Sequence, residues 1–61
     1  MAEPALLRSR VFDYLASHPD GTSLSALEQE FGLTAEQIAT VLENLIDEGK
    51  AERRGPLYLA L

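Results

Sequence analysis

The sequence predicts a mostly α-helical domain of the α+β class, with three helices followed by a short C-terminal β-hairpin. Three observations lead to this prediction. Apolar residues recur at helical spacing in three segments, glycines stand where two of these segments end, and the last residues change to strict alternation. We expect residues 1–61 to form one domain, because this length is near the lower limit at which a chain folds without disulfides or metal.

The first helix is expected at residues 4–17. Pro4 suits the first turn of a helix, where backbone N–H groups have no partner within the helix. One face of this helix carries Leu7, Val11, Tyr14 and Leu15, at spacings of three and four. The residues His18–Gly21 predict a turn, and the short segment Thr22–Leu24 after it is expected to be extended.

The second helix is expected at residues 26–31. Ser25 and Glu28 have the spacing of a capping box, in which the serine hydroxyl accepts from the backbone and the glutamate reaches back. The apolar residues of this short helix are Leu27 and Phe31. Gly32 follows them and favours the left-handed conformation that ends many helices.

The third helix is expected at residues 35–48 and has the strongest periodic pattern in the chain. Thr34 and Gln37 form a second capping box at its start. Its apolar stripe consists of Ile38, Val41, Leu42, Leu45 and Ile46. Gly49 ends the helix, and the stripe is expected to face the core.

The hairpin is expected at residues 51–61, with strands at 51–54 and 57–61 and a turn at Gly55-Pro56. In the second strand Leu57, Leu59 and Leu61 alternate with Tyr58 and Ala60. The leucines are therefore expected to form the apolar inner face, with Tyr58 and Ala60 outward. As the last element of the chain, this strand is also expected to leave an open sheet edge.

Several classes of protein are not expected from this sequence. There is no cysteine, and the single histidine, His18, precedes a proline in a turn, so we expect no metal site. Glycine-rich phosphate loops are absent, and the adjacent carboxylates lie on exposed helix surfaces rather than in a dry cleft. We therefore expect neither catalysis nor a cofactor.

The composition also limits the location and partners of the protein. We expect no signal peptide, and no apolar run is long enough for a membrane span, so a cytoplasmic protein is expected. The net charge is −5, from ten acidic and five basic residues. Such a balance repels polyanions at long range.

The order of elements resembles the winged-helix superfamily of bacterial transcription regulators. The matching segments are Leu24–Leu27, Phe31–Thr34, Val41–Gly49 and Glu52–Arg54, and the resemblance extends from Leu7 to Leu61. It implies that the third helix enters the major groove of DNA while the hairpin wing contacts the backbone or minor groove. It thus implies a small DNA-binding transcription regulator with double-stranded DNA as its partner.

The resemblance also implies which residues would contact DNA. The candidates for base contacts are Gln37, Thr40 and Asn44, because Gln and Asn can form paired hydrogen bonds with adenine and Thr can contact the thymine methyl group. The candidates for phosphate contacts are Lys50, Arg53 and Arg54, and Arg8 and Arg10 on the first helix are expected to form a second small positive area.

The charge of the third helix favours an alternative. Glu36, Glu43 and Asp47 share its outward face, and six acidic residues but no basic one lie between Leu24 and Gly49. These carboxylates suggest a protein-interaction module that binds a basic partner protein. A third alternative is an acidic mimic of DNA.

Self-association is a separate expectation. Leu6 and Phe12 make the first helix more apolar than a solvated surface requires, and Tyr58 is expected to face outward from the terminal strand. The sequence therefore predicts a homodimer formed through the first helix, the terminal strand, or both.

Overall fold

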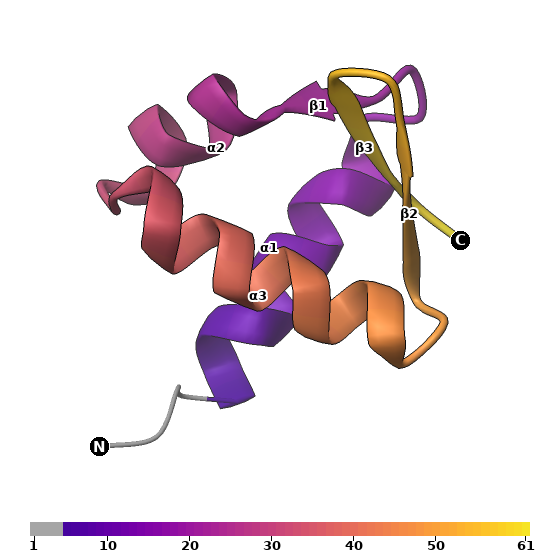
Figure 1. The fold of residues 1–61 in the computed structure, drawn as a ribbon, viewed down its shortest axis with the longest axis horizontal. Coiled ribbons are helices and arrows are strands. Elements are labelled where there is room, and N and C mark those ends of the chain that lie inside the picture. The colour runs from indigo at the N-terminus through magenta and orange to yellow at the C-terminus, as the bar shows by residue number, and fades with distance from the viewer. Residues whose placement is uncertain (1–4) are drawn as a thin grey trace.

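The computed structural model describes residues 5–61, and it contains three helices and a small antiparallel sheet (Figure 1). The helices are α1 (Ala5–Ser17), α2 (Leu24–Phe31) and α3 (Ala35–Asp47), and the strands are β1 (Thr22–Ser23), β2 (Ala51–Arg54) and β3 (Leu57–Ala60). The expected fold class, a helix-turn-helix core with a C-terminal β-wing, is confirmed. Pro4, the expected start of the first helix, lies outside the described residues.

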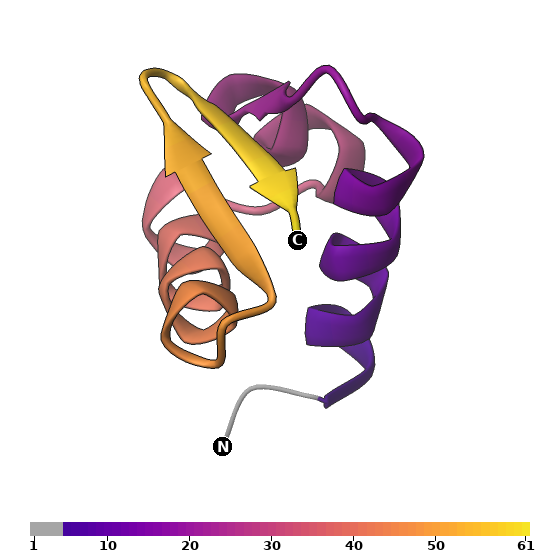
Figure 2. The ribbon, with the colours of Figure 1, turned by 90° about the vertical axis from the view of Figure 1, so that its right-hand side faces the viewer.

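The helices and the sheet enclose a single aliphatic core. α3 lies in front of α1 in Figure 1, and the view in Figure 2 places these two helices on opposite sides of the molecule. α3 also contacts α2 and β2, so it is the central element of the fold. The buried apolar residues are Val11, Leu15, Leu27, Ile38, Val41, Leu42, Leu45 and Ala51.

The inward stripe of α3 is as expected except for one residue. Ile38, Val41, Leu42 and Leu45 are buried, whereas Ile46 is 36% exposed and does not belong to the core. Ile46 lies about 80° around the helix from Ile38, at the border of the stripe. The expectation that Ile46 faces inward is therefore wrong, because α1, α2 and the sheet cover a narrower arc of the helix.

The two helix starts differ in how well the sequence predicted them. The capping box of α3 is confirmed: Gln37 N–H donates to Thr34 Oγ1 at 3.2 Å, and Thr34 N–H donates to Gln37 Oε1 at 3.0 Å. The expected box at Ser25 is wrong, because Ser23 is the N-cap of α2 and its Oγ accepts from Ala26 N–H at 3.2 Å. Ser23 has the extended backbone that an N-cap requires, as the last residue of β1.

The extended segment expected at Thr22–Leu24 is confirmed as strand β1 at Thr22–Ser23, but Leu24 belongs to α2 instead. Its order is β1-β3-β2, so β3 is the central strand and the open edges belong to β1 and β2. Tyr58 is in register with Thr22 on one side and with Arg53 on the other. The expected open edge on the terminal strand is therefore wrong. β1 has only two residues, too few for a periodic pattern.

The two faces of β3 are the reverse of what was expected. Tyr58 and Ala60 pack against the core, and Leu57 and Leu59 alternate with them on the other face. The reason is the register of the hairpin, which pairs Ala60 with the buried Ala51. Gly55, with φ of 58°, allows a two-residue turn, and this turn determines the register.

The first prediction concerns the cap of α2. Ser23→Ala should lower the free energy of unfolding by about 1 kcal/mol, because Ala26 N–H loses its acceptor. Ser25→Ala is the control, and it should change stability by less than about 0.5 kcal/mol, because Ser25 is exposed within the first turn. Urea denaturation followed by circular dichroism measures both. A larger loss for Ser25→Ala than for Ser23→Ala would contradict the assignment.

The second prediction concerns a buried hydroxyl. Thr22 is 5% exposed, and its Oγ1 has no hydrogen-bond partner among the described residues. Thr22→Val should therefore raise the free energy of unfolding by about 1 kcal/mol. The control is Thr40→Val, which removes an exposed hydroxyl and should stay within about 0.5 kcal/mol of the parent in thermal denaturation. Destabilisation by Thr22→Val would show that this hydroxyl is hydrogen-bonded in solution.

Candidate functional site

The outward surface of α3 carries a row of acidic residues. Glu36, Glu43 and Asp47 are all exposed, and together with Thr40 they recur at intervals of three and four residues along the helix. None of these three carboxylates forms an ion pair within the described part of the chain. α3 lies in front of α1 in Figure 1, and the exposure of these residues shows that no other described element covers this surface.

The expected base-contact residues lie together on one flank of this surface, but their polar atoms are partly engaged. Gln37 Oε1 accepts from Thr34 N–H in the capping box, and Thr40 Oγ1 donates to Glu36 O at 3.0 Å. Asn44 is half-buried. Paired hydrogen bonds from Gln37 to adenine require both its oxygen and its nitrogen, so such a contact would break the cap.

The expected phosphate-contact residues lie near the hairpin, and each has an interaction within the protein. Lys50 Nζ lies 3.6 Å from Glu48 Oε1, and Arg54 Nε lies 3.0 Å from Glu52 Oε2. Arg53 Nε donates to Gly55 O at 3.2 Å. The three basic side chains are exposed, but the two carboxylates among them leave this region with a local charge of only +1.

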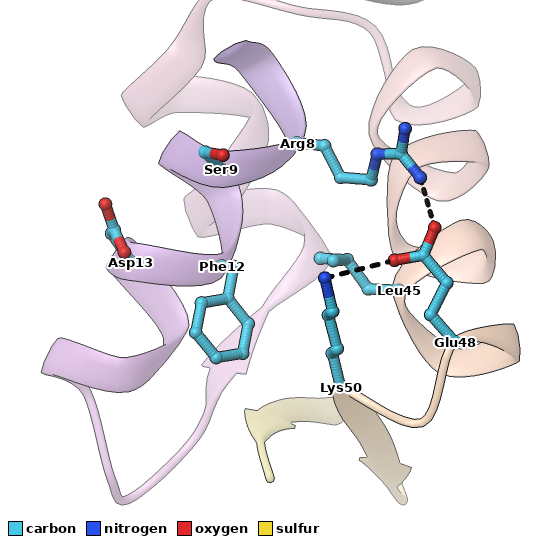
Figure 3. A pocket seen from close by; sticks show the side chains of 7 residues that line it. All are labelled: Arg8, Ser9, Phe12, Asp13, Leu45, Glu48 and Lys50. Atoms are coloured by element: carbon cyan, nitrogen blue, oxygen red, sulfur yellow. Dashed lines mark hydrogen bonds and ion pairs between the residues drawn. The ribbon is translucent and has the colours of Figure 1, made fainter. Parts of the chain in front are cut away.

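A shallow cleft of about 440 Å³ lies between α1 and the C-terminal end of α3 (Figure 3). Its lining residues are Arg8, Ser9, Phe12, Asp13, Leu45, Glu48 and Lys50. Glu48 lies between two cations and forms ion pairs with both Arg8 and Lys50. The positive charge expected on α1 from Arg8 and Arg10 is therefore reduced, because the side chain of Arg8 pairs with Glu48 at the end of α3.

The sequence could not indicate this ion-pair network. Arg8 and Glu48 are separated by 40 positions, and only the packing of α1 against α3 brings them together. With Asp13 also in the lining, the four charged residues of the cleft have no net charge. Their ion pairs connect α1 to the turn that leads into β2.

The three residues expected to form a dimer surface lie in different environments. Leu6 is 62% exposed on α1, Phe12 is half-buried at the cleft, and Tyr58 packs against the core. Tyr58 therefore does not extend the apolar surface of Leu6. The exposed leucine next to β3 is instead Leu61, at 67%.

Neither a membrane helix nor a metal site in the described part of the chain, nor a similar protein, points to a function for this chain. Among the described residues, no helix is long and apolar enough to cross a membrane, and no group of three His, Asp or Glu side chains could hold a metal ion. No protein-family model matches the chain, and no curated protein or solved structure matches it either.

Proposed function

We propose that this chain is a protein-interaction module of winged-helix architecture that binds a positively charged partner protein through the outward face of α3. The observation that carries the proposal is the row of Glu36, Glu43 and Asp47, which are exposed and lack ion pairs among the described residues. A complementary basic surface would accelerate association and determine the orientation of the complex.

The positions of these acids support a role beyond the stability of the helix. Glu36 lies in the first turn, where a negative charge is favourable next to the helix N-terminus. Glu43 and Asp47, by contrast, are one turn apart, and like charges at this spacing destabilise a helix by a few tenths of a kcal/mol. A Lys or Arg side chain of a partner would remove this repulsion, so we place Glu43 and Asp47 within the contact.

The apolar border of the acidic row supports a protein partner in particular. Ile46 is 36% exposed and lies one turn from Glu43 on the same side of α3. Protein interfaces combine an apolar centre with a polar and charged rim. Ile46 would supply the apolar contact and the carboxylates the rim.

DNA binding is the second candidate, on the basis of the resemblance to winged-helix regulators. It is supported by Arg53 and Arg54, which are exposed next to the hairpin turn at Gly55. In this function Gln37, Thr40 and Asn44 would contact bases, and Lys50, Arg53 and Arg54 would contact phosphates. We rank it second because affinity for DNA comes largely from the neutralisation of phosphates, and the α3 face would bring three carboxylates towards them.

The third prediction tests the acidic face with a defined probe, a fluorescein-labelled peptide of alternating Lys and Ala residues. In fluorescence anisotropy at about 50 mM salt, Glu43→Gln combined with Asp47→Asn should weaken binding by about tenfold, because two contacting charges are lost. Glu28→Gln combined with Glu30→Gln is the control. It changes the net charge equally but lies on α2, so it should weaken binding by less than about twofold.

The same assay with a labelled duplex of random sequence distinguishes the two candidates. We expect no association of the parent protein with the duplex at about 50 mM salt, where nonspecific contacts are strong. Duplex binding that disappears when Arg53 and Arg54 are both replaced by Gln would support the DNA-binding function instead. Equal losses of peptide binding in the two acidic double variants would contradict a contact site on α3.

A further inference from the structure

The sheet has an outer face that is turned away from the core. Its register places Glu52 beside Leu59, and Leu57 between Arg54 and Ser23. These residues alternate along their strands with Thr22, Ala51, Tyr58 and Ala60, which are buried or pack against the core. The outer sheet face is thus defined by Ser23, Glu52, Arg54, Leu57 and Leu59.

A row of leucines runs along the middle of the outer sheet face. Leu57 and Leu59 are half-buried and are not among the residues that pack against the core. Leu61 continues the row, because its N–H donates to Lys50 O at 2.9 Å and so extends the ladder between β2 and β3. Figure 2 views β2 and β3 from outside, with no helix in front of them. Leu57 is partly covered by the turn at Gly21, where an added Cβ would lie 3.0 Å from Leu57 Cβ, and no helix covers the rest of the row in this view.

The charges beside the leucines are balanced and self-complementary. Glu52 and Arg54 both lie on the outer sheet face, and their side chains form an ion pair at 3.0 Å. This face is therefore locally neutral, whereas the whole chain has a net charge of −5. Two copies of the chain repel each other when their acidic surfaces meet. Contact through the neutral outer sheet face avoids that repulsion.

We infer that the outer sheet face binds the same face of a second copy of this chain. A two-fold axis brings equivalent surfaces together, so Glu52 of each copy lies opposite Arg54 of the other while the leucine rows pack against each other. The two sheets would pack face to face, about 10 Å apart, as in β-sandwiches. This dimer surface is separate from the α3 face, and the inference does not depend on the proposed function.

The association is tested first with the apolar row. Sedimentation equilibrium between about 10 µM and about 1 mM should show the mass rising from 6.7 kDa toward twice this value. Leu59→Glu and Leu61→Glu should each keep the protein at the mass of one chain.

Two controls separate loss of the dimer from loss of the fold. Leu61 is 67% exposed, so Leu61→Glu should leave the helical circular dichroism spectrum unchanged even if Leu59→Glu perturbs the sheet. Leu6→Glu is the control, because Leu6 is also an exposed leucine but lies on α1, and it should retain the dimer.

Charge reversal then tests the two-fold arrangement. Arg54→Glu should weaken the dimer by at least about fivefold, because two carboxylates then face each other at each contact. Combining it with Glu52→Arg should restore the parent dissociation constant to within about twofold. Arg10→Glu is the control for net charge, since it makes the same charge change at an exposed position on α1 and should have little effect. A parent protein that stays monomeric at about 1 mM, a dimer that survives Leu61→Glu, or a double variant that fails to recover would each overturn the inference.

Discussion

Burial of the aliphatic stripe of α3 is the constraint on which the rest of the structure depends. Ile38, Val41, Leu42 and Leu45 are almost completely removed from solvent, and the helix that carries them contacts α1, α2 and β2. These four residues are half of the eight buried apolar residues in the described part of the chain. The angles between residues around a helix are fixed, so a helix that turns these four residues inward must turn Glu43 and Asp47 outward. The acidic surface therefore results from the same periodicity that forms the core.

The surface of the protein is divided into regions of different charge. The outward face of α3 is acidic, the cleft beside α1 has balanced ion pairs, and the outer sheet face is neutral and apolar. In the cleft, Glu48 bridges Arg8 and Lys50, which joins the beginning of the chain to the turn before β2. This bridge engages two of the five basic residues of the sequence. Arg54 is likewise paired with Glu52, so three of the five basic side chains lie beside a carboxylate, which is consistent with the proposed basic partner.

The two proposed contacts use different parts of this surface. The α3 face depends on long-range attraction, which salt weakens, while the outer sheet face depends on apolar contact between like copies. If both contacts form, each dimer presents two acidic α3 faces. A partner with repeated basic segments would then bind more tightly than a single module allows, because its second contact becomes intramolecular.

The sequence by itself determined the features that depend on residues within one helical turn of each other. These are the three helices, the capping box of Thr34 and Gln37, the positive φ of Gly32 at the end of α2, and the acidic face of α3. The tertiary structure decided which serine caps α2, because the pairing of β1 with β3 ends at Ser23 and the helix begins at Leu24. It also decided that Tyr58 rather than Leu59 faces the core, because an alternating strand has no preferred face until its register with Ala51 is known. The pairing of Arg8 with Glu48 likewise joins residues that only the packing of the helices brings together.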